Sequence, residues 1–309
     1  MTSTIRSALP LAAVAVLALV VDGGPVSPLM LALVAGVLCA QLPWPTGSIE
    51  VLGKTTLRLG VVLLGLRLSV DVVAQVGLEG ILIVVATIAA TYTATQLVGR
   101  WLGVDEDLRT LVAVGFSICG AAAIAGVQDL VRARRMAVAQ AVAMVTIFGS
   151  AMIVLVPAIT GLLGLSDRQA AVWAGASIHE VAQVVAAASA AAPLAVGIAV
   201  SIKLLRVAAL APMSLVVSRA AGGPRGVPWF VIGFVIAVLI RTTGILPAGI
   251  LDIADHATTA LLAAGMFALG LGVRLSVLAR GTGRLVALSA VSTTVAAGVS
   301  LVLVAWLVH

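Results

Sequence analysis

The segment Gly175-Ala-Ser-Ile-His-Glu-Val-Ala-Gln183 places His179, Glu180 and Gln183, two of them titratable, in an otherwise apolar stretch. Ionisable groups are costly at membrane depth, so they normally face a bundle interior or a watery cavity. The imidazole of His179 titrates near neutral pH, and a buried carboxyl such as that of Glu180 can keep its proton there. The segment therefore indicates a substrate site or a proton relay. The alternative is a hydrogen-bonded cluster that only fixes helix packing.

A zinc enzyme is the other chemistry to consider here, because His-Glu-Val-Ala-Gln differs by one residue from the His-Glu-x-x-His motif of metalloproteases. The second ligand would be Gln183, and the other histidines, His256 and His309, lie near a predicted loop and at the end of the chain. No nucleotide-binding motif is present either. We therefore expect no enzyme activity, no metal and no cofactor. On a helix, His179 and Gln183 would share one face.

A second candidate is Ser117-Ile-Cys119-Gly120, which precedes a run of alanines. Small residues let helices approach closely in membranes, which is one explanation. The other is a helix interruption at Cys119 and Gly120, which would present backbone N–H groups and the positive end of a half-helix to an anion. Gly270 and Gly272 occupy the matching place 150 residues later. Two broken helices would then cross in the membrane.

Two cations, Lys203 and Arg206, form the third candidate group, since both lie well inside an apolar run. They can snorkel if a helix end is near. Otherwise they supply positive charge to a cavity, where they attract an anion or neutralise Glu180. Arg58, and more weakly Lys54, offer a similar group in the first half of the chain. Guanidinium groups suit the planar, bidentate recognition of oxyanions.

The composition restricts the elements that hold these groups to membrane helices. The chain has 309 residues, of which 62% are hydrophobic and 10% are charged, and its mean hydropathy is +1.24. Backbone groups in hydrocarbon must be satisfied internally, and long unalternating Ala/Val/Leu runs favour helices over a barrel. We therefore expect an all-α polytopic membrane protein. The net charge of +6 then reflects basic loops at one membrane face rather than nucleic-acid binding.

Turn-forming residues and charges divide the chain into about eleven candidate transmembrane helices. They lie near residues 8–21, 28–42, 51–70, 78–99, 108–130, 134–163, 168–191, 193–217, 227–246, 257–278 and 284–308. We treat residues 1–309 as one transporter domain, with an extra N-terminal span at 1–24 and repeats at 25–165 and 166–309.

The repeat prediction comes from a shared offset of 150 residues. Leu111, Ala113, Gly115 and Gly120 recur as Leu261, Ala263, Gly265 and Gly270. Because this offset corresponds to five spans, an odd number, the two copies would have opposite orientations. Inverted repeats of this kind are typical of secondary transporters, whose sites lie near the midplane at interrupted helices.

The distribution of Lys and Arg predicts a cytoplasmic N-terminus and an external C-terminus. With that orientation, nine basic residues lie at inner ends: Arg6, Lys54, Arg100, Arg109, Arg168, Arg219, Arg225, Arg280 and Arg284. Five lie at outer ends: Arg67, Arg132, Arg134, Arg135 and Arg241. The cluster at 132–135 is the exception to the rule. It would be removed if the span at 108–130 were re-entrant, and that alternative stays open.

Five segments in order along the chain resemble the YeiH-type sulfate exporter family of bacterial inner-membrane proteins. They are Leu57-Arg-Leu-Gly-Val-Val-Leu-Leu-Gly-Leu-Arg67, Ser117-Ile-Cys-Gly120, Trp173-Ala-Gly-Ala-Ser-Ile-His-Glu-Val-Ala-Gln183, Lys203-Leu-Leu-Arg206 and Pro228-Trp-Phe-Val-Ile-Gly-Phe234. The resemblance implies a fold related to the sodium/proton antiporter and bile-acid symporter superfamily, with five-plus-five inverted repeats and crossed broken helices. The family often has Ser where this chain has Ala122, which puts the substrate in question.

We therefore expect a secondary transporter, an exporter by its resemblance, of a small anion such as sulfate, a sulfonate or a carboxylate. Ser117, Cys119 and Gly120 would bind the anion, the cations would attract it, and His179 and Glu180 would couple transport to protons. The expected partners are this substrate, a coupling proton or sodium ion, the bacterial inner membrane and a second copy of the chain. The alternatives are a proton- or sodium-coupled cation transporter that uses Glu180, and a non-transporting sensor or assembly component.

Overall fold

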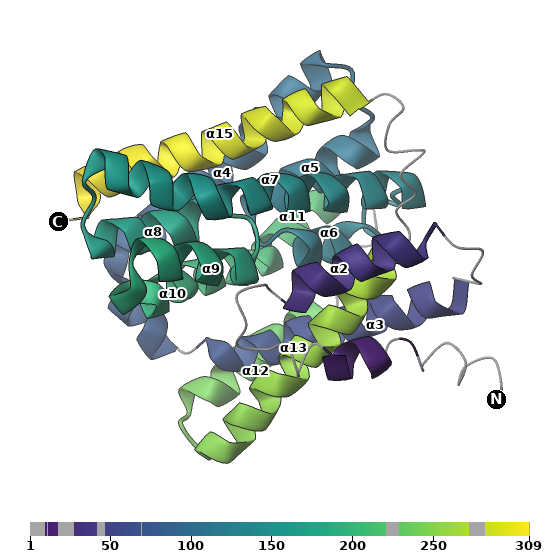
Figure 1. The fold of residues 1–309 in the computed structure, drawn as a ribbon, viewed down its shortest axis with the longest axis horizontal. Coiled ribbons are helices and arrows are strands. Elements are labelled where there is room, and N and C mark those ends of the chain that lie inside the picture. The colour runs from purple at the N-terminus through teal and green to yellow at the C-terminus, as the bar shows by residue number, and fades with distance from the viewer. Residues whose placement is uncertain are drawn as a thin grey trace. The chain divides into compact units, whose positions relative to one another are not determined.

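The computed structural model describes residues 10, 12–17, 28–41, 47–68, 70–220, 229–271 and 282–308. Every regular element in these residues is a helix (Figure 1), which confirms the predicted helical class. Five helices in the described residues are long and apolar enough to cross a membrane: Val76–Trp101, Arg135–Leu163, Pro193–Ala220, Ala248–Ala268 and Gly283–Leu307. The chain divides into two compact units, one formed by residues 1–69, 134–140 and 227–282 and the other by residues 70–133, 141–226 and 283–309.

Unit 1 is a group of helices packed on α13. Its described elements are α2 (Pro28–Cys39), α3 (Gly47–Leu64), the 3-10 turn η1 (Gly65–Arg67), α12 (Trp229–Thr242) and α13 (Ala248–Leu271). α13 packs on α2 and α3, and α12 packs on α3 and η1. Small residues permit this contact, because a Cβ at Gly60 would lie 2.7 Å from Leu262 and one at Gly265 would lie 2.7 Å from Leu57.

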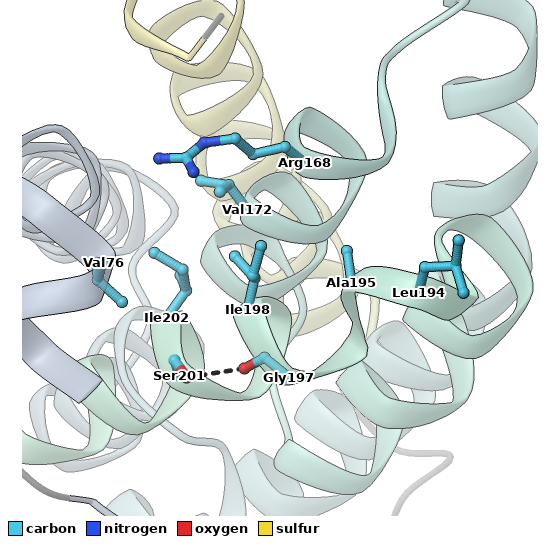
Figure 2. Close-up of a pocket in the computed structure, with 9 residues that line it drawn as sticks. All are labelled: Val76, Arg168, Val172, Leu194, Ala195, Gly197, Ile198, Ser201 and Ile202. Atoms are coloured by element: carbon cyan, nitrogen blue, oxygen red, sulfur yellow. Dashed lines mark hydrogen bonds between the residues drawn. The ribbon is translucent and has the colours of Figure 1, made fainter. Parts of the chain in front are cut away.

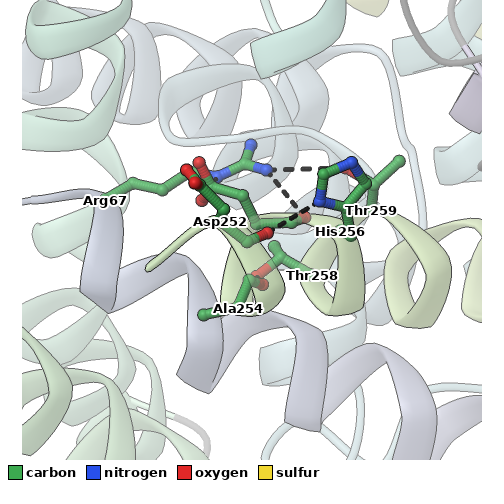
Figure 3. A network of polar contacts seen from close by, with 7 residues as sticks. Arg67, Asp252, Ala254, His256, Thr258 and Thr259 are labelled. Carbon is green, nitrogen blue, oxygen red and sulfur yellow. Dashed lines mark hydrogen bonds and ion pairs between the residues drawn. The ribbon is translucent and has the colours of Figure 1, made fainter. Parts of the chain in front are cut away.

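A polar network ties η1 to α13 inside unit 1 (Figure 3). Arg67 donates from Nε to Oδ1 of Asp255 at 2.8 Å and from Nη2 to the carbonyl of Asp255 at 3.1 Å. His256, which we expected near a loop, lies inside α13, where Nδ1 is 2.7 Å from the carbonyl of Asp252. The prediction of a loop around His256 was wrong. Asp252 and Asp255 are spaced so that, with His256, they fit one exposed face of a helix as well as they fit a loop.

Unit 2 contains the segments that carry most of the candidate residues. Its elements are α4 (Val70–Trp101), α5 (Glu106–Ser117), α6 (Ala121–Val127), α7 (Arg135–Leu163), α8 (Asp167–Ser177), α9 (Val181–Ala191), η2 (Pro193–Ala195), α10 (Val196–Ala208), α11 (Leu210–Ala220) and α15 (Thr282–Leu307). α4, α7 and α15 are long helices, whereas α5, α6, α8 and α9 have 7 to 12 residues. A helix needs about 20 residues to cross the hydrocarbon core, so none of these four crosses by itself.

One end of unit 2 is marked by a cavity of about 310 Å³ near the start of α4 (Figure 2). Val76 of α4, Arg168 at the start of α8, and Leu194 and Ala195 just after α9 all line it. α8 therefore begins, and α9 ends, at the same end of the unit. We call this the Arg168 end.

The opposite end of unit 2 holds a larger cavity of about 660 Å³. Arg100 near the end of α4, Arg109 of α5, Val131 after α6 and Ala220 of α11 all line it. α5 therefore begins, and the chain leaves α6, at this same end, which we call the Arg109 end. α4 is broken at Gly77, and Leu78 and Arg100 are 22 residues apart on its continuous part, so the two cavities are separated by about 33 Å, enough to span a bilayer.

Two predicted spans, 108–130 and 168–191, are thus re-entrant hairpins that enter unit 2 from opposite ends. The turn between α5 and α6 shows this directly, because a Cβ at Gly115 would lie 2.7 Å from Cδ1 of Ile124. Nine residues along a straight helix would separate these positions by about 13 Å. The re-entrant alternative that was left open for residues 108–130 is therefore the correct one. α4, α7, α10–α11 and α15 cross unit 2 from end to end.

Accessibility labelling tests this topology. In a background with Cys39→Ser and Cys119→Ala, we expect Glu106→Cys and Arg132→Cys to react with an impermeant maleimide from the same membrane face. Asp167→Cys should react from the opposite face, and all three positions are exposed in unit 2. Reaction of Glu106→Cys and Arg132→Cys from opposite faces would show that α5–α6 crosses the membrane and would contradict the hairpin assignment.

Candidate functional site

The tips of the two hairpins are interruptions in the helices of unit 2, in addition to the break at Gly77 in α4. α5 ends at Ser117, and the chain continues through Ile118 with φ −114° and ψ −98° and Gly120 with φ +75° before α6 begins. Only glycine adopts such a positive φ without strain. A Cβ at Gly120 would also lie 2.6 Å from Cγ of Glu180. The first tip therefore requires glycine both for its turn and for its contact with the second tip.

Lys203 and Arg206 of α10 bind the backbone carbonyls of both tips. Nζ of Lys203 donates to the carbonyls of Ile118 and Ile178, each at 2.7 Å. Arg206 donates to four carbonyls, two in each hairpin. They belong to Phe116, Ser117, Ala176 and Ile178. Both side chains are fully buried.

These contacts satisfy the orphan carbonyls that the ends of α5 and α8 would otherwise leave unpaired. A helix C-terminus also carries a partial negative charge, so a cation there is stabilising. The predicted positive charge at the site is therefore present, but Lys203 and Arg206 use their donors on the protein backbone. Neither was expected to do so from the sequence.

The carbonyls that each cation binds come from matching positions of the two hairpins. Gly115-Phe-Ser-Ile118 and Gly175-Ala-Ser-Ile178 share the pattern Gly-x-Ser-Ile. Lys203 bonds the carbonyl of the Ile in both copies, and Arg206 bonds that of the x residue in both. This four-residue pattern, 60 residues apart, is the sequence signal that locates the second interruption.

Glu180 links the two tips from the second hairpin. Its Oε1 accepts a hydrogen bond from the backbone N–H of Ala121 at 3.3 Å. Its carboxylate also accepts from the N–H of Gln183 in a capping box at the start of α9. The side chain of Gln183 accepts from the N–H of Glu180 at 3.1 Å and donates to the carbonyl of Thr146 on α7 at 3.3 Å. Gln183 therefore orients Glu180.

His179 lies between the tips and α15. Nε2 is 3.0 Å from Oγ1 of Thr293, and the ring packs on Phe116 with centroids 4.5 Å apart. The residue is fully buried, and Nδ1 has no hydrogen-bond partner. The hydroxyl of Thr146 is also buried without a partner. Two polar groups near the tips are thus unsatisfied, which is costly for buried groups.

The structure unites most but not all of the predicted site. It brings together the two tips and the cations of α10: Ser117, Cys119, Gly120, His179, Glu180, Gln183, Lys203 and Arg206. The hydroxyl of Ser117 bonds the carbonyl of Val114 at 3.3 Å within its own helix. Arg58 belongs to unit 1, where its guanidinium lies 5.7 Å from the ring centroid of Phe230.

The predicted interruption at Gly270 and Gly272 stays a prediction: α13 is helical from Ala248 to Leu271, and Gly272 and the segment after it lie outside the described residues. The offset of 150 residues did not point to the break at Ile178–Glu180, which is the one that contacts the break at Gly120. Apolar helices share small residues for packing reasons, so matches in Ala, Leu and Gly carry little information about interruptions.

Comparisons with known proteins place the chain in a family. The family model Conserved hypothetical protein 698 matches residues 8–289. A UPF0324 membrane protein of Corynebacterium glutamicum is 41% identical over 264 residues, which cover 81% of this chain and 76% of that protein. The UPF0324 inner membrane proteins YeiH of Salmonella typhi and Escherichia coli K12 are 36% and 35% identical over 277 residues, 84% of this chain and 79% of each relative.

The chain belongs to the YeiH family of membrane proteins. This confirms the resemblance inferred from its five segments. The names of the YeiH relatives and the five apolar helices support a multi-pass membrane location. No solved structure is significantly similar to the chain.

Removal of the Arg206 guanidinium tests its bonds to both tips. Arg206→Leu would leave the buried carbonyls of Phe116, Ser117 and Ala176 without this donor, while that of Ile178 keeps Lys203, and we expect a loss of about 3–5 kcal/mol in stability. Thermal unfolding in detergent should show a fall in Tm on the order of 10 °C. Arg206→Lys should lose less, and Arg219→Leu, an exposed residue at the end of α11, should unfold like the wild type. An unchanged Tm for Arg206→Leu would contradict the assignment.

Proposed function

We propose that the chain is a secondary transporter of a small anion, which binds between the two hairpin tips of unit 2. The buried charge at these tips is the observation that carries the proposal. Among the described residues, Lys203, Arg206 and Glu180 are the charged side chains of Lys, Arg, Asp and Glu that are buried. Two cations and one carboxylate leave one positive charge at membrane depth. A bound anion would neutralise this charge, whose burial is otherwise unfavourable.

The partial charges at the ends of the hairpin helices also contribute to the charge balance at the tips. The C-terminal ends of α5 and α8 each carry about half a negative charge, which offsets about one of the two cations. The N-terminal ends of α6 and α9 have the opposite sign, and Glu180 lies against both. Glu180 is thus the anion already present at the site. The remaining positive charge is available to a second anion.

The chemistry of the tips favours a small oxyanion. Backbone N–H groups, the unpartnered Nδ1 of His179 and the hydroxyl of Thr146 are hydrogen-bonding groups of the kind that bind sulfate, sulfonate or carboxylate oxygens. The two tips enter from opposite ends, as expected for an inverted repeat with its site near the midplane. We accordingly propose α5–α6 and α8–α9 as the repeated elements. The family label of sulfate exporter is consistent with this ligand class.

The positions of arginine residues favour the Arg109 end as cytoplasmic. Contacts and chain continuity place Arg100, Arg109, Arg132, Arg219 and Arg284 at that end and Arg168 at the other. Cytoplasmic loops are enriched in Lys and Arg. With the hairpins re-entrant, the cluster near Arg132 joins this group and is no longer an exception. The end of α15 would then lie outside the cell.

A ligand screen on the purified protein tests the anion site. We expect sulfate, sulfite, methanesulfonate or acetate to raise Tm above that in chloride of equal ionic strength, because a ligand of the native state stabilises it. The anion that binds should also cross the bilayer in proteoliposomes that contain the protein. If none of these anions stabilises the protein or crosses the bilayer, the anion-transport proposal is wrong.

Glu180→Gln distinguishes anion binding from cation transport. The variant removes a negative charge and keeps the shape of the side chain, so we expect the anion that binds the wild type to bind about tenfold more tightly. Glu79→Gln, at an exposed position of α4, removes the same charge far from the tips and is the matched charge control. If Glu180 were a cation ligand, sodium would stabilise the wild type, and Glu180→Gln would abolish that effect instead.

A further inference from the structure

We propose that a row of buried hydroxyls between α4 and α15 conducts the coupling proton from the Arg109 end to His179. This inference rests on the proposed anion transport and identifies the coupling ion and its route. The hydroxyl row comprises Thr91 and Thr95 of α4 and Ser289, Ser292 and Thr293 of α15. Its members are 8% exposed or less.

The route begins at the Arg109 end of unit 2. The cavity of about 660 Å³ there is lined by polar groups that include Tyr92, Gln96 and Thr110. Nε2 of Gln96 lies 3.3 Å from Oγ1 of Thr110 and 3.2 Å from the Tyr92 hydroxyl. Gln96 directly follows Thr95 in α4. Water in this cavity can therefore reach Gln96, the residue of α4 next to the hydroxyl row.

The middle of the route is the contact between α4 and α15. Oγ1 of Thr95 and Oγ of Ser292 are 2.7 Å apart. Ser289 lies one turn from Ser292 toward the Arg109 end, and Thr91 lies one turn from Thr95 toward the other end. The hydroxyls of Ser289 and Thr91 are buried without a hydrogen-bond partner. Buried polar groups are normally paired with protein or ordered water, so these two indicate water between the helices.

The route ends at the imidazole of His179. Thr293 follows Ser292 in α15, and its Oγ1 is 3.0 Å from Nε2 of His179. Nδ1 on the other side of the ring has no partner. An imidazole can take up one proton and hold it as imidazolium, with a single N–H bond formed. Hydroxyl groups and bridging waters relay the proton to this ring because each of them both donates and accepts.

The charged groups near His179 determine when it takes up the proton. Lys203 and Arg206 of α10 share the carbonyl of Ile178 next to it, Glu180 follows it, and Cys119 lies at the facing tip. α15 presents the hydroxyl of Thr293 here. The two cations oppose a further positive charge, and a bound anion favours it. Anion binding should therefore be accompanied by proton uptake, and by linkage the anion should bind more tightly at lower pH.

A stopped-flow experiment with a pH-sensitive dye tests the route. The purified protein in weak buffer is mixed with sulfate, sulfite, methanesulfonate or acetate, while anion binding is measured in parallel by the shift in Tm. For an anion that binds the wild type, we expect the medium to become more alkaline. His179→Gln should bind the anion more weakly, because a ligand group is lost, and at anion concentrations that saturate the variant it should bind without this change. Ser289→Ala and Thr293→Val should bind it equally but take up the proton about tenfold or more slowly.

Ser300→Ala is the matched control for Ser289→Ala. Ser300 is a fully buried serine of α15 whose hydroxyl bonds the carbonyl of Ala296 at 2.6 Å, and it lies beyond Thr293 on the far side from the cavity. Its variant should take up the proton as fast as the wild type. If Ser289 has only a structural role, Ser289→Ala and Ser300→Ala should take up the proton equally fast. That result would overturn the route.

The outcomes for the wild type separate the two proposals. Anion binding without proton uptake overturns the proton route and leaves anion transport standing. Unchanged proton uptake in His179→Gln also overturns the route, since another group would then accept the proton. If none of the four anions binds or crosses the bilayer, the proposed function is overturned. The proton coupling, which rests on that function, is then overturned as well.

Discussion

The clamp formed by Lys203 and Arg206 is the interaction on which the rest of unit 2 depends. Two hairpins that enter from opposite ends leave the carbonyl ends of α5 and α8 pointing into a low-dielectric interior. Neither water nor a further helical turn can satisfy those carbonyls there. α10 crosses between the tips and supplies two cations one turn apart, each of which bonds both hairpins. The tips are thereby held together, and the N-terminal ends of α6 and α9 lie at the same depth against the carboxylate of Glu180.

The sequence predicted the helical class, the membrane location, the first interruption and most members of the polar cluster, although it also added Arg58, which belongs to unit 1. Composition and intramembrane charges are sufficient for these, because burial of such groups in lipid is so costly. It did not distinguish a hairpin from a span at 108–130 or 168–191, since both are apolar runs of about the right length. The bonds of Lys203 and Arg206 to backbone carbonyls could not be predicted either. They join residues about 30 to 90 positions apart in the sequence, and the spacing of apolar residues along a helix carries no information about such distant contacts.

The titratable groups of the site are of two kinds: those held in fixed contacts and those whose contacts can change. Lys203 and Arg206 are committed to carbonyls and act as structural charges. Glu180 and His179 have single or shared contacts, with the carboxylate bonded to Ala121 and the imidazole to Thr293. A change of protonation or ligand can therefore alter the contacts of these two without breaking the clamp. This arrangement would let one cluster hold two hairpins together and also respond to the anion and the proton that we propose.

The most direct measurement of the central claim is an anomalous-diffraction experiment on crystals soaked in selenate, a heavier analogue of sulfate. Our account predicts an anomalous peak between the two tips, within hydrogen-bonding distance of the N-terminal end of α6 or α9 or of His179. Lys203 and Arg206 should remain bonded to the carbonyls of Ile118 and Ile178. Selenate bound directly by Lys203 and Arg206, with those carbonyl bonds broken, would contradict the clamp. A peak found only outside the tips would contradict the site.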